Sequence, residues 1–82
     1  MTITMLYFAG VRDLVGHPEE QLELPRDVGT VGELREHLQR LHPTLQGQLD
    51  GVRFALNESF VDLAAALGNE DVVAVIPPVA GG

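Results

Sequence analysis

The chain contains no cysteine and no lysine. Without cysteine there is no disulfide, no thiolate metal ligand and no cysteine nucleophile, so the fold must be held by packing alone. The cations are five arginines against twelve acids, which leaves a net charge of −7. Such a chain is repelled by nucleic acid and anionic membranes, and it favours a partner with a basic face.

Long apolar runs and catalytic motifs are also missing. No apolar stretch approaches 18 residues and no basic leader precedes one, so we expect neither membrane insertion nor export, and we place the protein in the cytoplasm. No glycine-rich phosphate loop follows a strand, and His17, His37 and His42 have no cysteine partners. We expect these histidines on the surface and Glu19-Glu20 solvated. The chain is not expected to bind a metal or cofactor, or to be an enzyme by itself.

What is present fits one small domain. The 82 residues are 45% hydrophobic, enough for a single modest core. In residues 3–8 and 72–76, the residues that would point to one side of a strand and those that would point to the other are both largely apolar. This pattern is typical of central strands covered on both faces. Residues 20–24 alternate leucine with acids and predict an edge strand in a hairpin with the first. Two more strands are expected at 52–56 and 59–61, joined by a tight turn.

One main helix is predicted between these strands. Thr30-Val31-Gly32-Glu33 has the pattern of a capping box, so the helix should begin there and end before Pro43. Apolar residues at spacings of three and four form a single stripe. The stripe consists of Val31, Leu34, Leu38 and Leu41. Shorter helical turns are expected at 10–16 and 63–67.

The predicted element order is β-β-α-β-β-β. A right-handed crossover through the helix makes the first and last strands parallel neighbours at the centre of the sheet. This order predicts an α+β protein of the β-grasp class, a mixed sheet of about five strands packed on one main helix. We expect residues 1–78 to form this domain and residues 79–82 to form a flexible tail that projects from it.

The last residues of the sequence carry the strongest functional signal. Pro77 and Pro78 hold the backbone extended, and residues 79–82 reach about 13–14 Å beyond them. Gly81 and Gly82 have no side chain, so a channel too narrow for any Cβ would admit them. The pattern predicts a tail that enters a partner's active site. The alternative is that a glycine-rich terminus is frayed and has no role.

Three segments resemble a known family. They are Tyr7–Gly16, Leu56–Val61 and Glu70–Gly82, and the likeness to the small subunit of molybdopterin synthase (MoaD type) runs the whole length. The resemblance implies a ubiquitin-like sulfur carrier. An ATP-dependent activating enzyme (MoeB type) would adenylate Gly82, and a sulfur donor protein would convert it to a thiocarboxylate. The large subunit (MoaE type), in a heterotetramer, would pass that sulfur to a cyclic pyranopterin precursor.

The same resemblance implies where partners bind. The tail residues Gly81 and Gly82 would carry the chemistry, and an apolar patch on the sheet would contact the large subunit. The implied partner-binding residues are Phe8, Arg12, Phe60, Ile76, Pro77, Pro78, Val79 and Ala80. One departure is Val75-Ile76, where the family often has aromatic residues. Core packing is the alternative role for Phe8, Phe60 and Ile76.

Other functions share this fold and tail. A carrier for thiamine or another sulfur pathway would have the same Gly-Gly terminus, although the Pro-Pro-Val-Ala lead-in favours the pterin pathway. A ubiquitin-like modifier would use the same activation and then join covalently to lysines of other proteins. A docking domain whose tail has no chemistry would tolerate the loss of Gly82. The absence of lysine fits an activated terminus, because no side-chain amine of the chain itself could attack it.

Overall fold

The structure is a computed structural model, and it describes residues 1–78. It contains five strands, two α-helices and one short 3₁₀ helix. In chain order these are β1 (Thr2–Tyr7), α1 (Ala9–Val15), β2 (Glu19–Glu23), α2 (Val31–Leu41), the 3₁₀ helix (Pro43–Leu45), β3 (Arg53–Leu56), β4 (Ser59–Val61) and β5 (Val72–Ile76). The predicted tail, Val79 to Gly82, lies outside the described residues.

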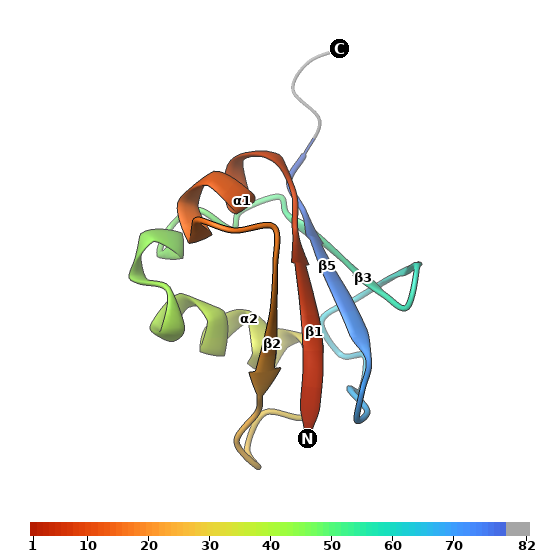
Figure 1. Cartoon of the computed structure of the whole chain (residues 1–82). Coiled ribbons are helices and arrows are strands. Elements are labelled where there is room, and N and C mark those ends of the chain that lie inside the picture. Colours follow the sequence, from red (N-terminus) through yellow and green to blue (C-terminus); the bar gives the residue numbers. More distant parts are fainter. Residues whose placement is uncertain (79–82) are drawn as a thin grey trace.

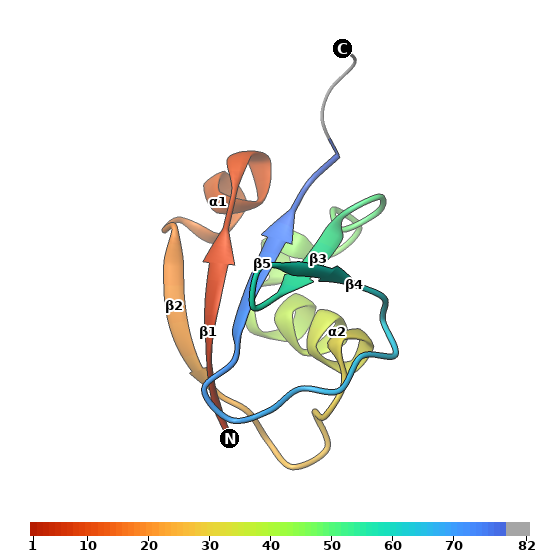
Figure 2. The ribbon, with the colours of Figure 1, turned by 90° about the vertical axis from the view of Figure 1, so that its right-hand side faces the viewer.

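The five strands form one mixed sheet in the order β2-β1-β5-β3-β4 (Figures 1 and 2). β1 and β5 are parallel and lie at the centre, and the other pairs are antiparallel. Asn57 and Glu58 join β3 to β4 with φ of 48° and 73°, the positive values that a two-residue hairpin turn needs. The β-grasp prediction, the edge position of β2 and the tight turn are therefore confirmed.

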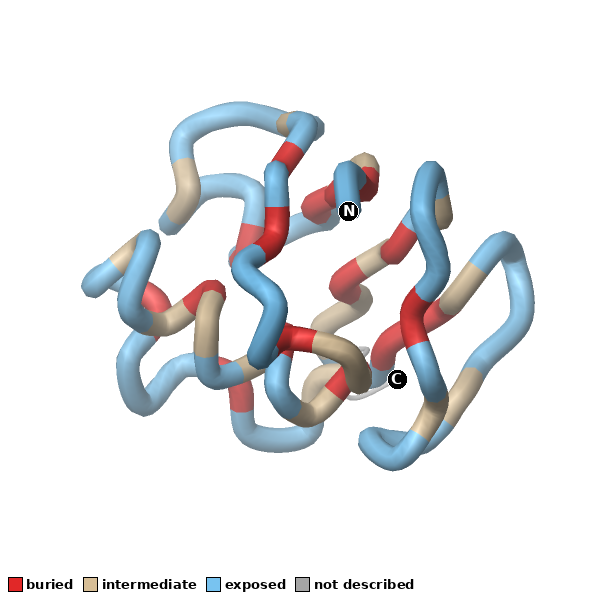
Figure 3. Tube along the Cα trace, turned by 90° about the horizontal axis from the view of Figure 1, so that it is seen from below, coloured by how far each residue is buried: buried red, intermediate tan, exposed pale blue. Residues whose placement is uncertain are grey.

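The core lies between one face of the sheet and α2. Ile3, Met5 and Tyr7 of β1 and Val73 and Val75 of β5 point into it, and each is at most 2% exposed. Figure 3 shows the buried residues gathered between the elements.

The expectation that β1 and β5 are covered on both faces is wrong. Burial alternates along both strands, and their outward residues are only partly buried or exposed. Figure 2 shows the sheet in front of α2, so the helix covers only the far face. The outer face therefore presents apolar side chains without a covering layer among the described residues.

Helix α2 begins as predicted. The Thr30 hydroxyl accepts from the Glu33 N–H at 3.2 Å, and the Glu33 carboxylate accepts from the Thr30 N–H at 3.1 Å. Residues 63–67, predicted as a helical turn, are not helical. Their carbonyls accept from the first turn of α2 instead, from Gly32 N–H at Leu63 and from Val31 N–H at Ala65. This satisfies N–H groups that a helix start leaves without partners.

The apolar stripe of α2 is shorter than predicted. Val31, Leu34 and Leu38 are fully buried, but Leu41 is 45% exposed. The helix ends at Leu41, and the 3₁₀ helix that follows turns Leu45 into the core in its place. The buried stripe therefore ends at Leu38, whereas the spacing predicts that it extends to Leu41.

Replacing Leu38 with alanine should destabilise the domain strongly. Leu38 is fully buried in the middle of α2, so Leu38→Ala is expected to lower the free energy of unfolding by about 2–5 kcal/mol. The matched control is Leu41→Ala on the same helix, which removes an exposed side chain and should change stability by less than about 0.5 kcal/mol. Urea denaturation measures both. Equal losses for the two variants would contradict this account of the helix.

Candidate functional site

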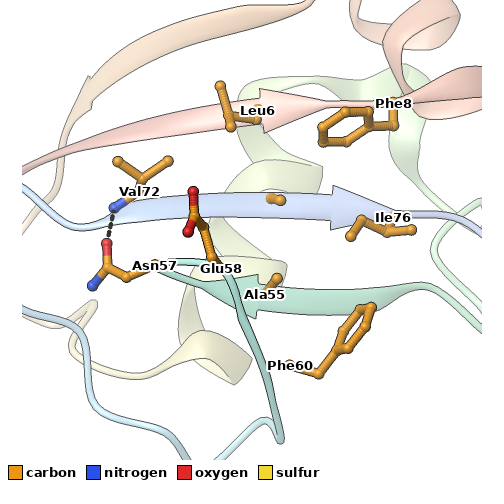
Figure 4. A pocket seen from close by; sticks show the side chains of 9 residues that line it. Leu6, Phe8, Ala55, Asn57, Glu58, Phe60, Val72 and Ile76 are labelled. Carbon is orange, nitrogen blue, oxygen red and sulfur yellow. Dashed lines mark hydrogen bonds between the residues drawn. The ribbon is translucent and has the colours of Figure 1, made fainter.

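The outer face of the sheet contains an apolar groove of about 600 Å³ (Figure 4). Its floor is a row of residues paired across four strands. Leu6 of β1 lies opposite Ala74 of β5, Ala74 opposite Ala55 of β3, and Ala55 opposite Phe60 of β4. Because two alanines stand between a leucine and a phenylalanine, the sheet is hollowed at its centre.

Larger side chains border this row on both sides, at the two ends of the groove along the strand direction. Phe8 and Ile76 lie at the end where β5 finishes, and Val72, Asn57 and Glu58 lie at the other end. Phe60 is 52% exposed, and Phe8 is exposed as well. Large aromatic side chains that are exposed together on an apolar surface are typical of a protein-binding site.

Of the residues that the sequence assigned to partner binding, three lie together. Phe8, Phe60 and Ile76 all line the groove, and none of them belongs to the core cluster. Arg12 is exposed on α1 and does not line the groove. Pro77 is partly buried and Pro78 exposed, directly after β5. The other two, Val79 and Ala80, lie outside the described residues, as do Gly81 and Gly82, to which the resemblance assigns the chemistry.

Several groove residues were not singled out from the sequence. The alanines and Leu6 make the floor, and the Arg53 guanidinium lies 3.8 Å above the centre of the Phe60 ring. The outward residues of the central strands were a usable signal. Leu6 and Ala74 are apolar at positions that would be polar in a sheet with one solvated face, and such positions indicate either a second covering layer or a docking surface.

A second group of chemistry-bearing side chains joins β1, β2 and the end of α2. The Tyr7 hydroxyl donates to Glu20 Oε2 at 2.5 Å, and His42 Nε2 lies 2.6 Å from the same oxygen. The side chains of Glu20 and His42 are only 19% and 17% exposed. The expectations of a solvated Glu20 and a surface His42 are therefore wrong, because the hairpin of β1 and β2 brings Glu20 against the C-terminus of α2.

This cluster changes how its members titrate. Burial raises the pKa of Tyr7, and the neighbouring Glu20 carboxylate raises it further. Partial burial alone would raise the pKa of Glu20, but the hydrogen bonds to Tyr7 and His42 and the charges of His42 and His17 outweigh it and hold that pKa below its usual value. The cluster lies on the core side of the sheet, away from the groove, so we assign it a structural role.

Replacing Glu20 should make the free energy of unfolding less dependent on pH in the acidic range. Glu20→Gln is expected to cost roughly 1–3 kcal/mol at neutral pH, because charge-assisted hydrogen bonds are lost. The folded pKa of Glu20 is depressed, so its stabilisation is complete above the unfolded glutamate pKa of about 4.3 and is lost as pH falls through the folded value. The difference between wild type and variant should therefore shrink in acid. Denaturation at a series of pH values measures it.

The matched control for this prediction is the neighbouring residue. Glu19 is exposed on the same strand, so Glu19→Gln should leave stability nearly unchanged at every pH. A Glu20→Gln penalty that stays constant down to strong acid would show that the lost interaction does not depend on the carboxylate charge.

Residues 1–78 contain neither a candidate metal site nor a candidate membrane-spanning helix. Within that range no three histidine, aspartate or glutamate side chains are grouped so as to hold a metal ion. None of the helices described is long and apolar enough to cross a membrane.

Comparison with known proteins identifies the family of the chain. The model of the ThiS family matches residues 5–82. The molybdopterin synthase sulfur carrier subunit of Mycobacterium tuberculosis is 37% identical over 81 residues, which cover 98% of this chain and 96% of that protein. The family-model match includes the strands that form the groove and also residues 79–82.

Solved structures show the same fold. SAMP1 from Haloferax volcanii, at 24% identity, superposes with a TM-score of 0.87 over the full length of both chains. A chain at 26% identity superposes with a TM-score of 0.72, again over both full lengths, and was solved in the complex of subunits 1 and 2 of the molybdopterin-converting factor from Helicobacter pylori. The chain therefore belongs to the ThiS family and, within it, to the MoaD-type sulfur carrier subunits of molybdopterin synthase.

Proposed function

We propose that this carrier holds its sulfur as a thiocarboxylate on Gly82 and delivers it while the groove is seated on the large subunit of molybdopterin synthase. The observation that carries this proposal is the position of the groove at the end of β5. Phe8 and Ile76 border it at that end, and Pro77 follows Ile76 directly. A partner seated on the groove is thus adjacent to the point from which the last residues continue.

The chemistry requires activation before sulfur transfer. A carboxylate is a poor electrophile, so an oxygen of Gly82 first attacks the α-phosphate of ATP on an activating enzyme, and pyrophosphate leaves. Sulfur at the sulfide level, released by a donor protein, then attacks the acyl carbon and displaces AMP. AMP carries that oxygen away, and a thiocarboxylate remains. We assign the ATP site to the activating enzyme, and this chain supplies the acyl group.

The partner's active site supplies the remaining step. The large subunit holds a cyclic pyranopterin precursor, which receives the sulfur, and water returns the carboxylate to Gly82. We propose that Gly81 lets the tail enter that site, because a residue without a Cβ fits a narrow channel. Val79 and Ala80 would line the channel entrance, and Pro77 and Pro78 would hold the approach extended.

Docking is assigned to the groove. Phe8, Phe60 and Ile76 are accessible apolar side chains around a hollow, which suits insertion of apolar side chains from a partner. Arg12 is exposed on α1, which follows Phe8 directly, so it would contribute a polar contact at the rim. The Helicobacter pylori complex of two subunits supports an assembly of this kind.

The test of the proposed function is an intact mass. The purified chain is incubated with ATP, a sulfur source and the activating enzyme, and its mass should rise by the difference between a sulfur and an oxygen atom. Omission of ATP is the control and should leave the mass unchanged. The product should then lose its sulfur when the large subunit and the pyranopterin precursor are added.

Other outcomes would assign other functions. Covalent adducts between this chain and lysines of other proteins would indicate a modifier. A thiocarboxylate that forms but is never consumed by the large subunit would indicate a carrier for thiamine or another sulfur pathway. No change of mass under any condition would reject Gly82 as the site of chemistry.

A further inference from the structure

The groove has opposite charges at its two ends. Arg53 lies opposite Ile76 in the pairing of β3 with β5, at the end where the tail begins. Glu58 lies in the turn between β3 and β4, and it lines the groove beside Val72 at the other end (Figure 4). Val72 and Ile76 are four residues apart on β5, so these two positions of the strand are about 13 Å apart along the groove.

Arg53 is held in place by Phe60. Its guanidinium lies 3.8 Å from the centre of the ring, which is a cation–π contact at an exposed site. Arg53 makes no ion pair with any residue from 1 to 78. In a chain with twelve acids, this cation is thus available at the edge of an apolar surface.

Glu58 is positioned by the backbone. Its φ of 73° belongs to the tight turn, and its carboxylate extends over the groove from the β4 side. Asn57, beside it, anchors the turn to β5, since its side chain accepts from the Val72 N–H at 2.9 Å and its own N–H donates to the Val72 carbonyl. The negative end of the groove is therefore fixed relative to the strand that leads to the tail.

We propose that these two charges orient the large subunit on the groove. The occupant is an apolar segment of that subunit that presents an acidic side chain to Arg53 and a basic side chain to Glu58. This inference rests on the proposed function, and it names the chemistry of the surface that the groove accepts. In the reversed orientation, the partner's acidic side chain would meet Glu58 and its basic side chain would meet Arg53. The like charges disfavour that orientation, and the favoured one places the partner's active site at the tail end of the groove.

The physical effect is one of specificity more than of affinity. The apolar floor supplies most of the contact area, whereas charge pairs at a rim contribute mainly to the association rate and to the choice of register. Because such pairs are exposed, added salt should weaken them. The predicted signature is therefore a salt-dependent loss of binding on charge reversal.

The experiment is titration of the purified large subunit with wild type and variants at low and high salt. Arg53→Glu and Glu58→Arg should each weaken binding roughly tenfold at low salt and less at high salt. Arg53→Met keeps an apolar stem over Phe60 and removes only the charge, so it should give a smaller loss in the same direction. Arg53→Lys should bind nearly as well as wild type.

The matched control is Arg40→Glu, which makes the same change of net charge on the exposed face of α2. Equal losses for Arg40→Glu and Arg53→Glu would overturn the inference, because only net charge would matter. Wild-type affinity for Arg53→Met and Glu58→Arg would overturn it as well. The inference would also be overturned if the charge-reversed variants bound the large subunit normally but failed to react with the activating enzyme. The same holds if their only effect were to abolish a self-association of the chain.

Failure of the proposed function would look different. In that case the wild-type chain itself would not bind the large subunit. If only the charge inference fails, the wild-type chain binds and the charge variants bind equally well. Unfolding curves of each variant separate a loss of binding from a loss of structure, and both Arg53 and Glu58 are exposed, so their replacement should leave stability nearly unchanged.

Discussion

Deletion of Gly82 should abolish sulfur transfer and leave the domain intact. The shortened chain still ends in a glycine carboxylate, but its reach is reduced by about 3.3–3.6 Å. Reacting atoms in a formed site must approach to about 3–3.5 Å, so a deficit of this size removes productive geometry. Complementation of a strain that lacks the carrier should fail, and no thiocarboxylate should be consumed by the large subunit.

Two measurements isolate the tail from the scaffold. The deletion removes no core residue and no groove residue, so the free energy of unfolding and the affinity for the large subunit should match wild type. Addition of one glycine after Gly82 is the reciprocal control, since it displaces the carboxylate by the same distance in the other direction and should also block transfer. Restored cofactor synthesis by the deletion variant would reject the carrier mechanism.

Phe60→Arg should break docking without unfolding the monomer. Phe60 borders the groove and is half exposed, so its ring is available to a partner and contributes little to the core. Aromatic residues at the centre of an interface commonly cost 2 kcal/mol or more when removed, which corresponds to a loss of affinity of about 30-fold. The new arginine also lies beside Arg53, which adds repulsion. Titration calorimetry with the large subunit measures the loss.

Leu63→Arg is the matched control for this prediction. Leu63 is 51% exposed, almost the same as Phe60, but it does not line the groove. Its replacement should leave binding unchanged, so a similar loss in both variants would point to a general effect of charge. If Phe60→Arg unfolds the monomer by circular dichroism, Phe60 belongs to the packing of the domain and the docking assignment is wrong.

The sequence determined those features that depend on local patterns. The capping box at Thr30, the burial of Leu34 and Leu38, and the tight turn at Asn57 each follow from residues within a few positions of one another. The central position of β1 and β5 also followed, because the two most apolar strands lie at the ends of the sequence and a right-handed crossover makes them parallel neighbours. Family membership was predicted from the three segments that resemble the family, and the comparisons confirm it.

Tertiary structure decided the features that depend on contacts between distant segments. Leu41 follows the helical spacing but is exposed, because the chain turns after it and Leu45 fills the core. Residues 63–67 have helical composition but bond to the start of α2, where free N–H groups are available. No local pattern could indicate that Glu20 meets His42 across 22 positions.

The groove shows the same limit most clearly. The sequence contains its apolar residues, and the outward apolar positions of β1 and β5 predict a face covered by a second layer, whereas the described residues leave that face open. Periodicity reports that a side chain is apolar and on which side of a strand it lies, but not what layer covers that side. Only the assembled sheet, with α2 on one face, left Leu6, Ala74, Ala55 and Phe60 as a row open to a partner and brought Arg53 over Phe60 at its edge.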